Sequence, residues 1–313
     1  MILFKTKRET SVEFHCKGAA ISSIKTRNAL ELVMFNESAR YQGIVGRCAN
    51  RINNASFILN DQEYSLSGPL HGGIDGFDNA VWNLLSKAED SVSFFLLDKD
   101  NNQGYPCDLL ITATYKISET IDYLSIKLEI SAKNQDSIRS TIFNPTIHTH
   151  FNLSGFKTDI LAHTLQIPNQ IAAIKVNDFL IPIGVSSDPL LSFRNEKQLG
   201  RDITMFDKDP FYGFDHYFKI KETESSVSLA AILKYSDVSL KVYTSSIGFQ
   251  IYTGNWLNGE YKSRDGIVYN KWSCIAIEPM DPVDAINQED RDLVIIKPGQ
   301  EKRQFIEFKF TGI

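Results

Sequence analysis

Apolar and polar residues alternate strictly along Leu124-Ser125-Ile126-Lys127-Leu128-Glu129-Ile130-Ser131, residues 124–131. The same period of two recurs in residues 238–243 and 306–310. Successive side chains of a β-strand point to opposite faces, so this pattern predicts half-buried strands with one apolar face. Similar short runs occur near residues 19–26, 55–59, 92–97, 109–116, 164–167, 227–235 and 248–252.

Turn-forming residues separate these runs, as in Asn60-Asp61, Asn101-Asn102-Gln103-Gly104 and Pro298-Gly299. Helical periodicity is nearly absent, apart from a turn or two expected around residues 284–292. Many short strands joined by turns predict an all-β protein, an antiparallel sandwich or barrel. No linker or change in composition divides the chain, so we predict a single domain over residues 1–313. The polar segment 192–210 is interpreted as a long surface loop.

Composition excludes several classes of protein. The 313 residues are 42% hydrophobic and 23% charged, which is enough apolar material for a sizeable core. The net charge of −5 argues against a nucleic-acid binder, because neutralising phosphates requires clustered Lys and Arg. No apolar stretch approaches the roughly 20 residues that a membrane-spanning helix needs, so no membrane association is expected.

Four scattered cysteines, at positions 16, 48, 107 and 274, form no Cys-x-x-Cys pair. This spacing favours reduced, buried thiols over a disulfide framework or a zinc site. The amino terminus also lacks the charge order and the apolar core of a secretory signal. We therefore expect a cytoplasmic protein.

A carboxylate and an imidazole are the first candidates for chemistry. Glu278 ends the apolar run 273–278, and His148 lies in the strand-like segment 144–155. Burial in a pocket would raise the pKa of Glu278 and make it a usable general base near neutral pH. An imidazole facing the same pocket could donate the second proton. The pair predicts metal-free acid/base chemistry.

His148 and His150 also present an alternative. Residues two apart on a strand share a face, and His-x-His on a strand is a metal-ligand spacing. Such a site needs a carboxylate a few residues later, and none follows before Asp159. We therefore expect no metal, and two hydrogen-bonded core histidines remain the structural alternative.

Further polar residues lie in segments rich in glycine or aromatic residues. Aromatic faces stack on sugar rings, while amides, carboxylates, guanidinium groups and imidazoles bind hydroxyl groups. The surface salt bridge is the plain alternative for an arginine in such a segment. The candidate binding residues are Asn50 and Arg51 in 46–52, His71 in 70–73, Asp215 in 213–218, and Gln250 in 248–256.

Read in order, these segments resemble the aldose 1-epimerase (galactose mutarotase) family from about residue 17 to the end of the chain. The segments that carry the resemblance are Gly-Arg-Cys-Ala-Asn-Arg-Ile at 46–52, Leu-His-Gly-Gly at 70–73, His-Thr-His-Phe-Asn-Leu-Ser-Gly at 148–155, Phe-Asp-His at 214–216, Gln-Ile-Tyr-Thr-Gly-Asn at 250–255 and Ile-Glu-Pro at 277–279.

The resemblance implies a large antiparallel β-sandwich, the galactose mutarotase-like supersandwich, that interconverts the α and β anomers of a hexose such as galactose or glucose without a cofactor. It implies that Glu278 is the base for the anomeric hydroxyl and that His148 is the acid for the ring oxygen. The implied sugar contacts are Asn50, Arg51, His71, Asp215 and Gln250. The family usually has Tyr where this chain has His150, so we assign His150 to substrate binding and selection.

Other functions remain open alongside this one. The chain could be an epimerase of another sugar, such as a pentose, a deoxy sugar or a phosphorylated sugar. A phosphorylated substrate would call for more basic residues than Arg47, Arg51 and Lys271 near these motifs. A non-catalytic sugar-binding module on the same fold is the alternative from another class, although it would need neither acid nor base. The expected partner is a small-molecule aldose, and the expected assembly is a monomer or homodimer.

Overall fold

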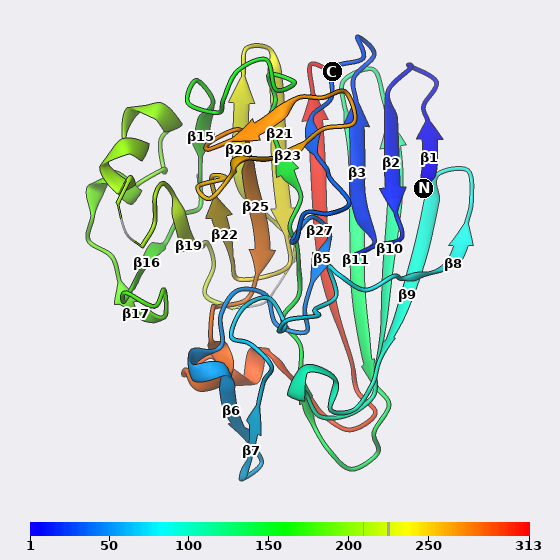
Figure 1. Ribbon diagram of the computed structural model, residues 1–313, viewed down its shortest axis with the longest axis vertical. Helices are drawn as coiled ribbons and strands as arrows, with labels where there is room; N and C mark the ends of the chain where they lie inside the picture. Colours follow the sequence, from blue (N-terminus) through cyan, green and yellow to red (C-terminus); the bar gives the residue numbers. More distant parts are fainter. Residues whose placement is uncertain (209, 224–225) are drawn as a thin grey trace.

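The computed structural model describes residues 1–208, 210–223 and 226–313 of the chain. Two large antiparallel sheets dominate it (Figure 1). The nine-stranded sheet contains, in spatial order, β18 (Lys197–Gln198), β15 (Thr164–Gln166), β20 (Ser228–Tyr235), β21 (Val238–Thr244), β27 (Glu301–Thr311), β11 (Leu124–Asn134), β10 (Leu109–Glu119), β9 (Ser91–Asp98) and β8 (Asn83–Lys87).

The seven-stranded sheet is built from shorter strands. In spatial order they are β17 (Pro182–Val185), β16 (Ala172–Val176), β19 (Asp215–Lys219), β22 (Gly248–Tyr252), β25 (Ile275–Met280), β14 (His150–Phe151) and β4 (Val33–Met34). This sheet combines strands from almost the whole chain, so residues far apart in sequence become neighbours on it.

Smaller sheets and short 3₁₀ segments complete the structure. The smaller sheets pair β1 (Ile2–Lys5), β2 (Ser11–His15) and β3 (Ala20–Lys25); β12 (Thr141–Ile142) with β26 (Ile295–Ile296); β13 (Thr146–Ile147) with β5 (Ile44–Val45); β23 (Asn258–Lys262) with β24 (Val268–Asn270); and β6 (Ser56–Leu59) with β7 (Gln62–Ser65). The 3₁₀ segments are η1 (Asn53–Ala55), η2 (Asn102–Gly104), η3 (Pro189–Leu191), η4 (Leu199–Arg201), η5 (Ile203–Phe206), η6 (Ala285–Asn287) and η7 (Arg291–Leu293). No helix among the described residues is long and apolar enough to cross a membrane.

The core lies between the two large sheets. The ring of Phe151 on β14 packs 5.1 Å from that of Phe308 and 5.9 Å from that of Phe310, both on β27. Side chains alternate along a strand, so a residue next to Phe151 faces away from this core. His150 is that residue, and it lines a cavity on the opposite face of the seven-stranded sheet.

The predicted strands and the all-β class are confirmed. The opening stretch forms β11, where Leu128 and Ile130 are buried and Lys127 is exposed. The turns expected near 284–292 are η6 and η7. All four cysteines are free thiols, and Cys16 is only partly buried.

The interpretation of residues 192–210 as a long surface loop is only partly correct, because most of the described residues are exposed but several are ordered and buried. This segment contains the short strand β18 and the 3₁₀ segments η4 and η5. Phe193, Leu199 and Ile203 are buried in the main core, so these apolar side chains anchor the segment. The segment includes Pro210, whereas residue 209 lies outside the described part.

Candidate active site

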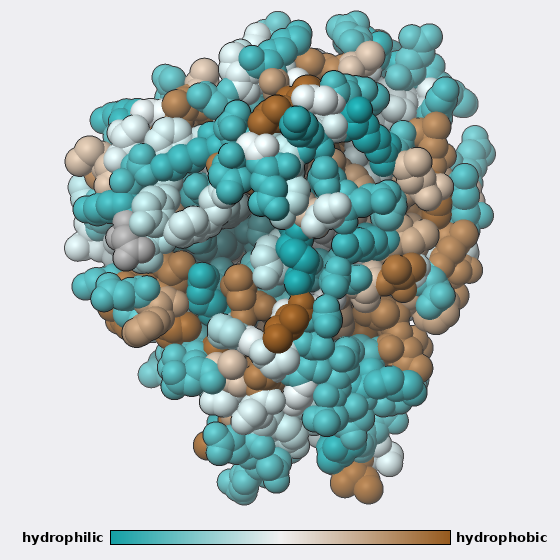
Figure 2. All heavy atoms as spheres, in the orientation of Figure 1, coloured by the Kyte–Doolittle hydropathy of each residue, from teal (hydrophilic) through white to brown (hydrophobic). Residues whose placement is uncertain are grey.

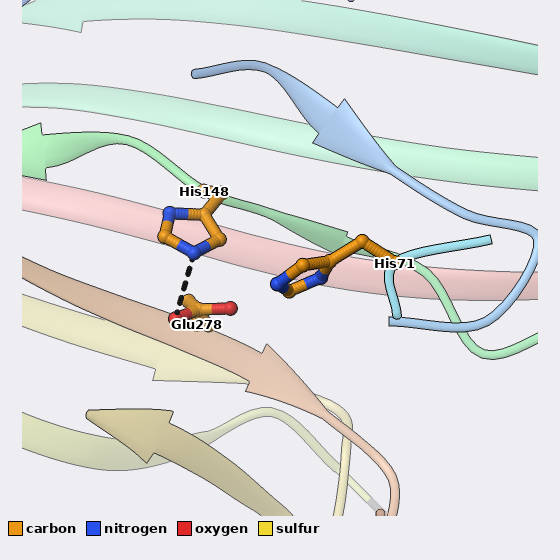
Figure 3. A group of neighbouring side chains, drawn as sticks. All are labelled: His71, His148 and Glu278. Carbon is orange, nitrogen blue, oxygen red and sulfur yellow. Dashed lines mark ion pairs between the residues drawn. The ribbon is translucent and has the colours of Figure 1, made fainter. Parts of the chain in front are cut away.

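Strand register brings Glu278 and His148 together. His150 on β14 lies opposite Ala276 on β25, and the two strands are antiparallel. A step of two residues back from His150 therefore matches a step of two residues forward from Ala276, which places His148 opposite Glu278. His148 Nε2 lies 3.2 Å from Glu278 Oε1, and both side chains are nearly fully buried (Figure 3). The predicted acid and base are thus in direct contact although they lie far apart in the sequence.

The next two strands add a carboxylate and an amide. Gln250 on β22 lies directly opposite Glu278, and β19 pairs with the other edge of β22. Gln250 Nε2 donates a hydrogen bond of 2.5 Å to Asp215 Oδ1. Asp215, Gln250 and Glu278 therefore form a polar row across three neighbouring strands.

Two loops place the remaining predicted residues over this row. The backbone N–H of Asn50 donates to His71 Nδ1 at 3.1 Å, and Arg51 forms an isolated bridge with Leu70. Asn50 and His71 both have positive φ, 57° and 51°, and the side chains of both line the cavity. Figure 3 shows the ring of His71 directed toward His148 and Glu278.

One cavity of about 360 Å³ is lined by all eight of the predicted site residues. The face drawn in Figure 2 is hollowed left of its centre, over the region of β22 and β25 in Figure 1. A volume of this size falls within the range of small-molecule sites. The other lining residues are Met34, Ala39, Arg40, Tyr41, Gln42, Leu70, Tyr252, Trp256, Leu257 and Tyr261.

The sequence reasoning missed the contribution of the segment between β4 and β5. The Tyr41 ring lies 4.6 Å from the His71 ring and 6.3 Å from the His148 ring. Arg40 Nε donates to the buried Asp78 carboxylate at 2.8 Å, which also accepts from the Tyr41 backbone N–H. This irregular segment shows no strand or helix period, so no local pattern signals a site there.

Two of the three basic residues near the motifs are not in the cavity. Arg47 is fully buried: its guanidinium group forms an ion pair of 2.5 Å with Asp98 and donates to the carbonyl oxygens of Pro106 and Cys107. Lys271 forms an ion pair with Asp207. Of the two arginines in the 46–52 motif, one supports the fold and the other faces the cavity.

Burial moves the pKa values of the central pair in opposite directions. Desolvation, followed by the nearby Asp215 charge, raises the pKa of Glu278 well above its ordinary value. Desolvation lowers the pKa of His148 to about 4. Burial also lowers the pKa of His71 and of His150, and the neighbouring His148 contributes to both. The site therefore disfavours separated charges, and a single proton shared by Glu278 and His148 keeps it close to neutral.

One group in the cavity has metal-ligand residue types: potential ligand atoms of His71, His148 and Glu278 lie within 4.8 Å of one another. A neutral imidazole has one donor and one acceptor nitrogen. Because Nδ1 of His71 accepts the Asn50 N–H, Nε2 carries the proton, and neither nitrogen has a free lone pair for a metal. These residues fit a hydrogen-bond donor at His71 better than a metal ligand.

Comparison with known proteins gives a consistent result. A family model described as aldose 1-epimerase matches residues 1–309. A galactose mutarotase of Rattus norvegicus is 34% identical over 294 residues, which cover 90% of this chain and 82% of that protein. An aldose 1-epimerase of Haemophilus influenzae is 33% identical over 285 residues, which cover 85% of this chain and 79% of that protein.

Solved structures share the fold. The crystal structure of an aldose epimerase homologue from C. elegans superposes with a TM-score of 0.82 at 22% identity, covering 99% of this chain and 98% of that one. A galactose 1-epimerase from Lactobacillus acidophilus gives a TM-score of 0.79 at 23% identity, covering 98% and 93%. The fold of this chain thus belongs to a known architecture.

Proposed function

The chain belongs to the aldose 1-epimerase family and is an isomerase that interconverts aldose anomers, and we propose that Glu278 and His148 are the base and acid of this reaction. The observation that carries the proposal is the 3.2 Å contact between Glu278 Oε1 and His148 Nε2 in the wall of the cavity. The anomeric oxygen and the ring oxygen of an aldose are bonded to the same carbon. An acid and a base that serve both oxygens must therefore lie close together.

The reaction needs two proton transfers and no redox change. The shared proton first passes from Glu278 to His148 across their 3.2 Å contact. The Glu278 carboxylate then removes the proton of the anomeric hydroxyl group, and the His148 imidazolium protonates the ring oxygen as the bond from C1 to that oxygen breaks. The open-chain aldehyde rotates about its C1–C2 bond, which exposes the other face of the carbonyl. Ring closure then reverses both transfers. One proton shared by the pair always leaves one donor and one acceptor.

The other predicted residues fit roles in holding the sugar. We propose that Asp215 and Gln250 bind hydroxyl groups on one side of the ring, and that Asn50 and Arg51 do so from the loop above. His71 acts as a donor through Nε2–H, because the Asn50 amide occupies its Nδ1. The tyrosine and tryptophan side chains of the cavity offer faces for the apolar side of the sugar.

The substrate that fits this lining is a neutral aldose, such as galactose or glucose. Among the described cavity residues, the only guanidinium groups are those of Arg40 and Arg51, and Arg40 is already paired with Asp78. A phosphorylated sugar would therefore find a single arginine, Arg51, that has no ion-pair partner among the described residues and donates only to the Asn50 amide oxygen. We favour an unmodified hexose over a sugar phosphate for this reason.

Three expectations about the whole protein stay with this proposal: one domain over residues 1–313, a cytoplasmic location, and a monomer or homodimer. The first is supported by a core cluster that contains residues of both large sheets. The second is supported by the four free thiols, which suit a reducing compartment. Limited proteolysis and the native mass in solution test the first and the third.

The decisive experiment is an anomerisation assay by polarimetry on freshly dissolved sugars, using glucose, galactose, xylose, arabinose and a hexose phosphate. We expect the highest kcat/KM with a neutral hexose. A sugar-binding module would bind the same sugars, detectable by calorimetry, without accelerating their anomerisation. Turnover confined to the phosphorylated sugar would contradict the proposed substrate class.

A further inference from the structure

Two polar side chains in the cavity wall, besides those of the proposed acid and base, have unused hydrogen-bonding capacity. Gln42 and His150 are 4% and 5% exposed, and both line the cavity. The Nε2 amide group of Gln42 and the Nδ1 atom of His150 are buried without a hydrogen-bond partner among the described residues. Both atoms are covered by neighbouring groups, so a ligand reaches them only when the two side chains turn slightly toward the cavity. Buried polar groups in proteins normally have partners, so these two side chains are candidates for such a contact.

The amide of Gln42 has a fixed orientation. Its Oε1 atom accepts a hydrogen bond of 2.6 Å from the backbone N–H of Asn36. The remaining capacity of the side chain is therefore its two N–H groups. A partner at this position must supply an acceptor oxygen.

His150 differs from His71, the other histidine beside His148. The Asn50 amide fixes the tautomer of His71, whereas among the described residues no hydrogen bond fixes either nitrogen of His150. Burial lowers the pKa of His150, which favours the neutral ring with one donor and one acceptor. A hydroxyl group in the cavity can satisfy the less buried Nε2 in either tautomer, because a hydroxyl group both donates and accepts.

The two side chains belong to the same side of the cavity. His150 lies opposite Met34 on the paired strands β14 and β4, and Gln42 belongs to the segment that leaves β4. The carbonyl oxygen of Gly43, the residue after Gln42, accepts the His148 backbone N–H at 2.8 Å. By contrast, the strands β19 and β22, which carry the other polar groups of the sheet, lie on the other side of β25.

We propose that Gln42 and His150 form a second hydroxyl-binding wall that selects among neutral aldoses. This inference rests on the proposed anomerase function and extends it. One sugar hydroxyl group accepts a hydrogen bond from the Gln42 amide and exchanges one with the His150 ring. An aldose that lacks this hydroxyl group, or holds it in the other configuration, leaves both side chains unsatisfied and reacts more slowly.

The test combines protein variants with deoxy sugars. For wild type, His150→Phe and Gln42→Met, kcat/KM is measured by polarimetry on the best hexose and on its 2-, 3-, 4- and 6-deoxy analogues. For wild type, we expect kcat/KM to be about 10-fold lower on the one analogue that lacks the hydroxyl group bound by Gln42 and His150, because loss of a neutral hydrogen bond has roughly that effect. In either variant, the same deoxygenation should change the rate less than about 2-fold.

Controls separate the outcomes. His15→Phe lies outside the cavity and should keep the wild-type pattern, and Gln42→Glu keeps the acceptor for Asn36 N–H while removing the amide donor. His150→Asn replaces His150→Phe if thermal unfolding shows that the phenylalanine variant is misfolded. Equal losses on every analogue in wild type and in the cavity variants would overturn the wall. Failure of wild type to anomerise any parent sugar would instead overturn the proposed function.

Discussion

Replacement of Glu278 by glutamine should separate catalysis from stability. Glutamine has nearly the same shape as glutamate and still offers an oxygen near His148, but it cannot take a proton from the anomeric hydroxyl group. Loss of a general acid or base typically lowers a rate by about 10²–10⁴-fold, equivalent to roughly 3–5 kcal/mol of transition-state stabilisation. We expect kcat to fall by a factor of about 10² or more, while the affinity for the sugar is retained.

The same change should make the unfolding free energy less sensitive to pH. Burial and Asp215 raise the pKa of Glu278 above its unfolded value of about 4.5. The folded carboxyl group therefore keeps a proton that the unfolded chain has released. Its contribution to stability is complete below pH 4.5 and is lost as the pH rises toward the folded pKa. A glutamine side chain at this position cannot ionise, so we expect the variant to lose less stability than wild type on going from about pH 5 to about pH 8.

Polarimetry and urea unfolding at the two pH values provide the measurements. Glu31→Gln is the control, because Glu31 is a carboxyl group that lies outside the cavity and also has a raised pKa, although it is less buried than Glu278. It accepts hydrogen bonds from the Ile24 and Val33 amides. The control should anomerise sugars at the wild-type rate. Near-normal turnover in Glu278→Gln, or an equal loss in Glu31→Gln, would refute the assignment of the base.

Three other outcomes are expected. The pH profile of kcat/KM should be bell-shaped, with an acid limb near pH 4, where His148 takes up a proton in addition to the one that the pair already holds. His148→Asn should remove or displace one limb. An acid limb at pH 6.5 would contradict this prediction. Activity should survive exhaustive chelation, because the hydrogen bond from the Asn50 amide leaves His71 without a free lone pair for a metal. A loss of activity that one added divalent ion restores would refute this expectation. Burial lowers the pKa of His163 to about 4, and its Nε2 accepts the Leu153 N–H. Between pH 6.5 and 4 only the unfolded chain binds a proton at this residue, so the protein should lose about 3 kcal/mol of unfolding free energy as the pH falls over that range. In His163→Gln, the unfolding free energy measured with urea should depend less on pH over that range. An unchanged dependence on pH would show that this prediction is wrong.

Arg47 and Arg51 show where motif reasoning stops. The two arginines lie in one short segment, and residue type does not distinguish them. In the structure Arg47 is buried against Asp98, while Arg51 lines the cavity. The difference depends on the path of a turn and on carbonyl groups 59 and 60 residues away, which no local pattern encodes.

Gln42 and Tyr41 show that cavity residues can also lie in a segment that carries no recognisable motif. They lie in a segment without strand or helix period, so nothing in the local sequence marks them as cavity residues. Their position follows from the pairing of β5 with β13 and from the contact between Arg40 and Asp78. Loops acquire function through the elements that hold them, and those elements are distant in sequence.

The sequence by itself determined the all-β class and most strand positions, because burial of one strand face leaves a period of two that is visible in residues such as 124–131. Through its resemblance to a family it also indicated eight cavity residues. Only the tertiary structure decided that His148 meets Glu278, that His71 is a fixed donor, and that His150 Nδ1 has no partner among the described residues. These facts depend on strand register and on backbone amides brought in from other segments. A shift of one residue between β14 and β25 would turn His148 away from Glu278, and no local property of either strand fixes that register.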